Sequence, residues 1–312
     1  MKLESSLSKS SGIQLISLNQ CPVCQGTSRR QIFNITDSPV YDCNSCGLRY
    51  LDPCLSPLAM QSAYESNETL SNLHSFHEGY YDYGDLSIKS KTFSDFEKAL
   101  KLLEEHLSGS VKPYTIFDVG FGNGFFLALA KQRGWAVNGS DSSSKNAELA
   151  SKKFSLELLC TDFKKYESSG KLFDVVSFWD VIEHLPNPHE FIKKASLMLK
   201  PNGLILIGLP NDKSMLRFIS SFLYRATFGR FRKGIESTYF LEHAAYYNLK
   251  TLQNLLNQNK FVLCNHFLTS TDLEKYSFSR MDKLIAGTIL FLGKITGYEN
   301  RLVAVFQRER AH

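Results

Sequence analysis

A glycine-rich turn constrains the fold of this chain more than any other feature of its sequence. The turn reads Asp118-Val-Gly-Phe-Gly-Asn-Gly124, and it lies between a buried-strand run at 115–119 and a helix predicted over 124–133. Without a Cβ, glycine lets a backbone turn approach a bound nucleoside closely. The three glycines are Gly120, Gly122 and Gly124. A strand, such a turn and a helix in this order are typical of a sheet that binds a nucleotide-like cofactor at its carboxyl edge.

The pattern of strand followed by helix continues to the end of the sequence. Short apolar runs predict seven strands, at 115–119, 136–140, 156–160, 173–178, 204–209, 261–268 and 302–307. Apolar residues at helical spacing predict helices at 124–133, 144–154, 188–199 and 249–257. This alternation predicts an α/β fold built on a seven-stranded, doubly wound parallel sheet with helices on both faces.

The first third of the chain has a different character. The full sequence has 312 residues, 43% of them hydrophobic, which suffices for one sizeable core and a smaller module, so we expect two domains. The expected parts are a small β-rich module at 17–54, a linker with an amphipathic helix at 55–110, and the main domain at 111–312. The linker is rich in tyrosine, and Ser94 with Glu97 would form the capping box of its helix.

Two pairs of cysteines in the N-terminal module predict a metal site. Cys21-Pro-Val-Cys24 and Cys43-Asn-Ser-Cys46 are separated by the spacing that is typical of structural zinc sites. Four thiolates complete a tetrahedral shell around Zn²⁺ and leave no position for water, so the metal would be structural rather than catalytic. The alternative is a set of four unrelated buried thiols.

Acidic residues after the strands of the main domain add to the predicted cofactor site. Asp141 ends the second strand, where a carboxylate can accept hydrogen bonds from both hydroxyls of a ribose. Asp162 follows the third strand, from which its side chain can reach an adenine edge. Dehydrogenases also use a glycine-rich turn, but their third glycine is replaced here by Phe125.

Several motifs together resemble the class I S-adenosylmethionine-dependent methyltransferases. Besides the glycine turn and Asp141, the resemblance rests on Phe173-Asp-Val-Val-Ser-Phe-Trp-Asp-Val-Ile-Glu-His-Leu185 and on Leu199-Lys-Pro-Asn-Gly203. It extends from about residue 114 to the C-terminus, and it implies a Rossmann-like methyltransferase sheet with S-adenosylmethionine as the cofactor. The implied cofactor contacts are Gly120, Gly122 and Asp141, together with Asp118, Asp162 and Trp179.

Two of these acids have a simpler structural interpretation. Asp118 can be a local capping acid that shapes the turn, and Asp141 can be the N-cap of the following helix.

The N-terminal layout resembles bacterial methyltransferases that carry a zinc ribbon. The resemblance rests on the cysteine pairs, on Cys46-Gly-Leu-Arg-Tyr50 and on the tyrosine-rich linker. Such proteins are associated with the modification of sugars and other cell-surface or natural-product intermediates. We therefore expect a small-molecule, glycan or lipid-linked precursor as the acceptor, methylated at oxygen or carbon.

Candidates for a catalytic base follow the fourth and fifth predicted strands. Asp180, Glu183 and His184 follow the fourth strand, at the carboxyl edge of the sheet. His243, in a stretch at 239–247, would return to the same rim before the next helix. Histidine suits a base near neutral pH, because its unperturbed pKa is about 6.5. In relatives the Glu-His pair often contacts the cofactor or caps the loop instead. The motif Asp180-x-x-Glu183-His184 also resembles one that binds a divalent metal in some quinone-pathway O-methyltransferases.

A basic insertion separates this stretch from the fifth strand. Residues 213–233 contain six basic residues and no acidic one, interleaved with leucine, isoleucine and phenylalanine. One interpretation is a helical lid over the substrate. The other is a basic amphipathic helix that rests on an anionic membrane or holds a lipid-linked or phosphorylated substrate.

The remaining sequence properties narrow the function. The net charge of +5 is mild for this length and makes nucleic acid an improbable partner. Because the sequence shows no export signal, and its strongly apolar run at 284–292 is too short for a bilayer, we expect a cytoplasmic location, with possible contact at the inner membrane surface. Two alternatives remain: an RNA methyltransferase whose zinc ribbon binds the nucleic acid, and a non-catalytic scaffold that binds the cofactor.

Overall fold

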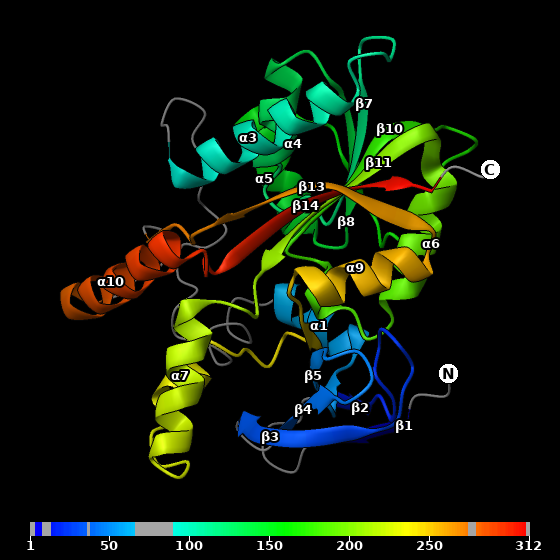
Figure 1. Cartoon of the computed structure of the whole chain (residues 1–312). Coiled ribbons are helices and arrows are strands. Elements are labelled where there is room, and N and C mark those ends of the chain that lie inside the picture. Colours follow the sequence, from blue (N-terminus) through cyan, green and yellow to red (C-terminus); the bar gives the residue numbers. More distant parts are fainter. Residues whose placement is uncertain (1–3, 8–13, 36–37, 66–89, 274–278, 310–312) are drawn as a thin grey trace.

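A central sheet of seven strands organises the chain (Figure 1). The computed structural model describes residues 4–7, 14–35, 38–65, 90–273 and 279–309. The central strands are β7 (Thr115–Val119), β8 (Ala136–Asp141), β9 (Leu159–Cys160), β10 (Phe173–Trp179), β11 (Leu199–Pro210), β13 (Phe261–Thr269) and β14 (Arg301–Arg308). Their order in the sheet is β13-β14-β11-β10-β7-β8-β9. The predicted α/β fold with a seven-stranded methyltransferase-like sheet is confirmed.

One strand corrects the expectation of a parallel sheet. Strands β7 to β11 pair in parallel, but β14 runs antiparallel to both of its neighbours, β11 and β13. Strand β14 is apolar along both faces because it is enclosed by the sheet and its helices. Such a run identifies a buried strand but carries no information about its direction.

Helices cover both faces of the sheet (Figure 1). One face packs against α3 (Lys91–His106), α4 (Phe125–Gln132) and α5 (Ser144–Phe154), and the other against α6 (Pro188–Met198) and α9 (Leu249–Gln258). The other helices are α1 (Pro57–Glu65), the 3-10 turn Ile182–His184, α7 (Met215–Ala226), α8 (Lys233–Glu236) and α10 (Arg280–Thr296).

Helix α3 begins one turn earlier than the proposed capping box. Its N-cap is Ser90, whose hydroxyl accepts a hydrogen bond from the backbone N–H of Phe93. Ser94 lies inside the helix and donates its own hydroxyl to the Ser90 carbonyl. Ser90 precedes the apolar stripe and Ser94 follows its first residue, Phe93, so spacing alone did not separate the N-cap from the first turn.

The N-terminal segment forms two small sheets beneath the central one. The first contains β1 (Glu4–Leu7), β2 (Gln14–Ser17) and β6 (Cys54–Leu55). The second has the order β12-β5-β4-β3, from β3 (Arg29–Ile35), β4 (Ser38–Cys43), β5 (Arg49–Leu51) and the distant β12 (Ala245–Tyr246). Most of the tyrosine-rich linker, at 66–89, lies outside the described residues.

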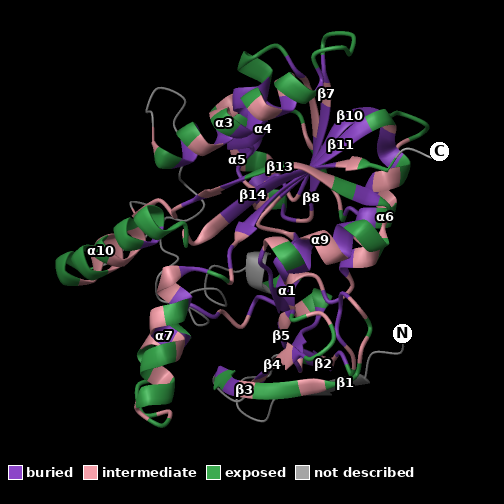
Figure 2. Cartoon of the chain, viewed as in Figure 1, coloured by how far each residue is buried: buried purple, intermediate pink, exposed green. Residues whose placement is uncertain are grey.

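A continuous hydrophobic core joins the second small sheet to one face of the central sheet. Leu48 and Tyr50 of the module are fully buried in the same cluster as Tyr247, Leu252 and Phe261 of the main part. Figure 2 shows this burial running from the central strands into the region of β5. The N-terminal segment is therefore packed onto the main fold rather than tethered to it.

Candidate active site

A cavity of about 430 Å³ opens at the carboxyl edge of the central sheet. Its lining includes the turn after β7, the ends of β8 and β10, and the residues that follow β13. Sequence-predicted residues that line it are Asp118, Gly120, Gly122, Asp141, Asp162, Trp179, Asp180, Glu183, His184 and His243. The chain thus brings both groups of candidate residues to one cavity.

The glycine turn has the backbone conformation that its sequence predicts. Gly120, Gly122 and Gly124 all have positive φ, of 68°, 56° and 81°. A Cβ on Gly120 would lie 2.8 Å from Val181, and one on Gly124 would lie 2.8 Å from the Cβ of Ala150. Nothing lies within 4 Å of the position that a Cβ on Gly122 would take, so this glycine faces open space. Gly120 and Gly124 are required by packing, whereas Gly122 leaves room for a ligand.

Asp118 lies at the base of the turn and is almost fully buried. Its Oδ1 accepts a hydrogen bond of 2.6 Å from the hydroxyl of Ser177 on β10. Burial raises the pKa of Asp118 to about 8, and the nearby Asp141 adds to this shift while the Ser177 hydrogen bond opposes it.

Asp141 connects the glycine turn to the end of β8. Its Oδ2 accepts the backbone N–H of Gly122 at 2.9 Å, and its Oδ1 accepts that of Ser143 at 2.9 Å. The N-cap of α5 is Ser143 and not Asp141, since the Ser143 hydroxyl accepts from the Asn146 backbone. Two backbone hydrogen bonds leave further acceptor positions on the carboxylate, which can bind hydroxyl groups.

Asp162 and Trp179 complete this half of the cavity. Asp162 follows β9 and accepts the backbone N–H of Lys164 at 2.7 Å. Trp179 ends β10, with its ring centroid 4.7 Å from that of Phe96 on α3. A Cβ on Gly208 would collide with the Trp179 ring, so glycine on the neighbouring strand β11 makes room for the indole.

Asp180 forms an ion pair that the sequence did not reveal. Arg301 Nη2, at the start of β14, lies 2.7 Å from Asp180 Oδ1 and 3.0 Å from Oδ2. Asp180 itself has a positive φ of 53°. The sequence signal for Arg301 was a charge immediately before the apolar run at 302–306 of that strand.

Two histidines from distant segments meet in the lining of the same cavity. The ring centroids of His184 and His243 lie 4.8 Å apart at an interplanar angle of 81°. His184 Nδ1 donates to the carbonyl oxygen of Glu242 at 2.9 Å, which leaves Nε2 as the basic nitrogen. Burial lowers the pKa of His184 below 6.5, and the Glu242 carbonyl opposes the shift.

Glu183 lies beside the two histidines. One ligand atom each from Glu183, His184 and His243 lies within 4.8 Å of the others. Burial raises the pKa of Glu183 well above 4.5, with a further contribution from Asp180. The spacing of the Asp180-x-x-Glu183-His184 motif therefore does not bring its three side chains together, because Asp180 binds Arg301 and His243 takes its place in the cluster.

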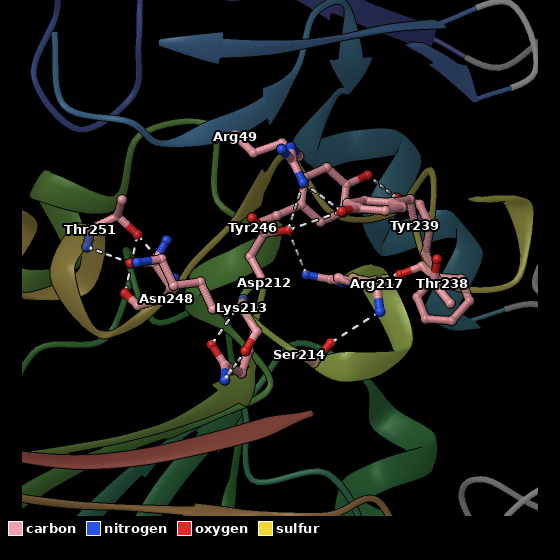
Figure 3. A network of polar contacts seen from close by, with 12 residues as sticks. Arg49, Asp212, Lys213, Ser214, Arg217, Thr238, Tyr239, Tyr246, Asn248 and Thr251 are labelled. Atoms are coloured by element: carbon pink, nitrogen blue, oxygen red, sulfur yellow. Dashed lines mark hydrogen bonds and ion pairs between the residues drawn. The ribbon is translucent and has the colours of Figure 1, made fainter. Parts of the chain in front are cut away.

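A network of polar contacts holds the stretch at 239–247 in place (Figure 3). Arg49 of β5 donates to the Tyr239 hydroxyl at 2.6 Å, and the same hydroxyl donates to Asp212 at 3.2 Å. Arg217 of α7 lies 3.3 Å from Asp212 and donates to the Thr238 carbonyl. Strand β12 then pairs with β5, immediately after His243. The N-terminal module therefore positions the segment that carries one of the two histidines.

A comparison with protein families identifies the family to which this chain belongs. A family model described as a methyltransferase domain matches residues 92–265, which is more than half of the chain. The chain belongs to this methyltransferase family. The matched region contains the glycine turn, the acids after β8 and β9, and both histidines of the cavity.

Two relatives of this methyltransferase share part of its sequence. The mitochondrial ubiquinone biosynthesis O-methyltransferase of Arabidopsis thaliana is 33% identical over 112 residues, which cover 33% of this chain and 35% of that protein. The ubiquinone biosynthesis O-methyltransferase of Parvibaculum lavamentivorans is 30% identical over 110 residues, which cover 33% of this chain and 44% of the relative. The chain thus spans less than half the length of these relatives.

A solved structure shares the fold over a larger part of the methyltransferase. The plantazolicin methyltransferase BpumL, in complex with a triazolic desmethylPZN analogue and SAH, has a TM-score of 0.52 and 21% identity. The likeness covers 80% of this chain and 95% of that chain. At this level of identity it establishes a shared fold.

Four cysteines form a second cluster in this methyltransferase, and none of them lines the cavity. The Sγ atoms of Cys21, Cys24, Cys43 and Cys46 all lie within 4.8 Å of one another. The closest pairs are Cys24 with Cys43 at 3.4 Å and Cys21 with Cys46 at 3.6 Å. Each knuckle is a tight turn: Gln25 N–H donates to the Cys21 carbonyl, and Gly47 N–H donates to the Cys43 carbonyl. Four converging thiols on two turns fit the donor set of a tetrahedral zinc ion.

The membrane-related expectations concern the insertion and the apolar run near the C-terminus. No described helix is long and apolar enough to cross a membrane. The insertion contains a helix, α7, as predicted, but none of residues 213–238, all of which the structure describes, lines the cavity. Helix α7 therefore lies outside the lining of this cavity, which the chain joins again at Phe240.

Proposed function

We propose that this chain transfers a methyl group from S-adenosylmethionine to an oxygen of a small-molecule acceptor. The observation that carries the proposal is the single cavity in which the glycine turn and Asp141 face the pair His184 and His243. The names of the ubiquinone biosynthesis O-methyltransferases, and the SAH bound to BpumL, support the same cofactor and reaction class. The same proposal includes a glycan or lipid-linked precursor as the acceptor, and carbon as the atom that is methylated.

In this proposal the cofactor occupies the half of the cavity around the glycine turn. Gly122 leaves the space for it, and Asp141 binds its ribose hydroxyls while holding the turn. Asp162 faces the adenine, and Trp179 closes the pocket against Phe96. Gly120, Gly124 and Asp118 act indirectly, because their packing and burial fix the shape of the turn.

His184 or His243 would accept the one proton that the acceptor hydroxyl releases. Methyl transfer is an in-line displacement in which the cofactor supplies the activated group, so the protein contributes alignment, exclusion of water and a base. His184 has its Nδ1–H fixed by a carbonyl and a lowered pKa, so it is neutral and able to accept a proton at pH 7. His243 packs against it and against Phe240. Asp180, bound to Arg301, would position the loop rather than accept a proton.

The proposal is tested with the full chain and S-adenosylmethionine labelled on its methyl group. We expect calorimetry to show cofactor binding, and labelled product to form with members of a panel of hydroxylated aromatic and sugar-nucleotide acceptors. Salt-dependent retention of RNA on filters, with label transferred to RNA, would instead support the nucleic-acid alternative. Cofactor binding without turnover on any acceptor class or in cell extract would support the scaffold.

We also propose that residues 17–54 form a structural zinc ribbon packed onto a methyltransferase domain at 111–312. The converging thiols of the four cysteines support a closed Cys₄ site. Elemental analysis of the protein purified under reducing conditions is expected to give about one zinc per chain. A metal-free protein with unchanged stability would contradict this assignment.

A further inference from the structure

Helix α7 has its polar and apolar faces reversed relative to an ordinary surface helix. Its buried residues are Arg217 and Ser220, which face the polar network and α8. Its phenylalanines are outside: Phe218 is 68% exposed and Phe222 is 62% exposed. After the helix, Phe228 is 96% exposed. A water-facing helix normally buries such side chains, so this face is suited to an apolar environment outside the protein.

Helix α10 shows the same property along its whole length. Of its seventeen residues, all described, Gly293 alone is buried. Its exposed apolar side chains recur at spacings of three, four and seven and so form one stripe. The stripe consists of Met281, Leu284, Ile285, Phe291, Leu292 and Ile295. The apolar stretch near the C-terminus is therefore a surface helix whose main face has no cover within the described chain.

The two helices lie together at one corner of the molecule. The backbone N–H of Met215, at the start of α7, donates to the carbonyl of Tyr298, just after α10. Figure 1 shows both helices leaving this corner and projecting away from the central sheet, and Figure 2 shows how much of both is exposed. We call this the α7–α10 surface, defined by residues 215–233 and 280–298.

Positive charge accompanies the apolar side chains of the α7–α10 surface. Exposed cations are Arg225, Arg230, Arg232, Lys233, Arg280 and Lys294. Residues 213–233 contain no acid, and α10 contains one, Asp282. Exposed phenylalanine and leucine next to arginine and lysine match the boundary between acyl chains and anionic headgroups.

We propose that the α7–α10 surface docks this protein on a membrane containing anionic lipids. Phe218, Phe222 and the α10 stripe enter the headgroup region, while the cations bind lipid phosphates. A second copy of the chain fits less well, because a twofold contact would bring two equally cationic surfaces together. The surface does not line the cavity, so docking goes beyond the proposed methyl transfer and does not depend on it.

Sedimentation with vesicles tests the proposal on the full chain. We expect the protein to pellet with vesicles of phosphatidylcholine and phosphatidylglycerol in equal parts, and to remain in solution with phosphatidylcholine alone. The triple change Arg225→Gln, Arg230→Gln and Lys233→Gln should weaken partitioning about a hundredfold, since each cation near an anionic surface contributes roughly fivefold. The pair Phe222→Ser and Phe291→Ser should also reduce it.

A matched control uses apolar side chains exposed elsewhere. Val111 is 86% exposed and Leu197 is 72% exposed, and neither belongs to the α7–α10 surface. Val111→Ser with Leu197→Ser should therefore pellet as the unaltered protein does. The proposal is overturned if the unaltered protein does not bind anionic vesicles. It is equally overturned if the control variant loses as much binding as the variant with both phenylalanines changed. It is also overturned if light scattering shows a dimer that the phenylalanine pair dissociates, because a second copy would then cover this surface.

Discussion

The two halves of the cavity are built in different ways. The proposed cofactor half comes from one stretch, from Asp118 to Trp179, in which each group lies at or just after the end of a strand. The acceptor half combines His184, His243 and Arg301, which lie far apart in sequence and are held by the N-terminal module and by β14. A local motif is sufficient to build the first half, whereas the second exists only in the complete tertiary structure. The two halves should therefore respond separately to mutation.

The largest difference between the effect on turnover and the effect on cofactor affinity is expected for His243→Ala. If His243 takes part in proton transfer, turnover should fall by about 10²–10⁴-fold, while S-adenosylmethionine affinity in calorimetry changes little. His266→Ala is a suitable control, because that histidine is exposed on β13 and does not line the cavity. Equal losses in turnover and cofactor affinity would show that the two halves are not independent. Full activity of His243→Ala would direct attention to His184.

The opposite result, a larger effect on cofactor affinity than on turnover, is expected for Asp141→Ala. Removing a carboxylate that accepts two backbone hydrogen bonds and faces the ribose should weaken cofactor binding by about 1.5–3 kcal/mol, the range for hydrogen bonds to charged groups. The maximum turnover at saturating cofactor should change much less than it does in His243→Ala. Unchanged cofactor affinity in calorimetry would remove Asp141 from the site.

Alanine substitutions at two glycines distinguish the loss of a ligand contact from the cost of backbone strain. Gly122 and Gly134 both have positive φ, and a Cβ on either would meet no atom within 4 Å. Each change to alanine should cost about 1 kcal/mol of stability through backbone conformation, as measured by denaturant unfolding. Gly122→Ala alone should also weaken cofactor binding, by about tenfold, because its Cβ would enter the cofactor space. Equal cofactor affinity in the two variants would mean that the cofactor does not approach Gly122.

The pH dependence of stability concerns one buried carboxyl in each half. Asp118 has a pKa near 8 when folded but about 3.8 when unfolded, so between these values the folded chain holds a proton that the unfolded chain has lost. Stability should therefore fall as pH rises from 4 to 8, because unfolding releases the proton that only the folded chain holds. Asp118→Asn should remove that part of the slope. The slope that persists belongs to groups such as Glu183, whose pKa is also raised. An unaltered slope in Asp118→Asn would show that Asp118 is charged in the folded chain.

Local periodicity made most of the fold predictable. Strand β7 and helix α5 match their predicted bounds, because apolar spacing reports burial directly. The direction of β14 did not follow from the sequence, since an apolar run is compatible with either strand direction. The position of α10 did not follow either, since an apolar run can be buried in the core or exposed on the surface.

The candidate site was predictable to different extents in its two halves. The glycine turn with Asp141 was evident, and the return of His243 to the rim followed from the topology of the sheet. Arg301 and the network around Arg49 and Asp212 were not evident, because their partners lie more than a hundred residues away along the chain.

The pairing of β12 with β5 has a consequence for how the chain is made. The residues of β12 are synthesised about 200 residues after those of β5. At a translation rate of 5–20 residues per second, roughly 10–40 s pass between the synthesis of β5 and that of the strand that completes its sheet. During that time its open edge can pair with another nascent chain, as unpaired edges do. Production of this protein should therefore be sensitive to the rate of translation and to chaperones that shield the N-terminal module until residue 246 has emerged.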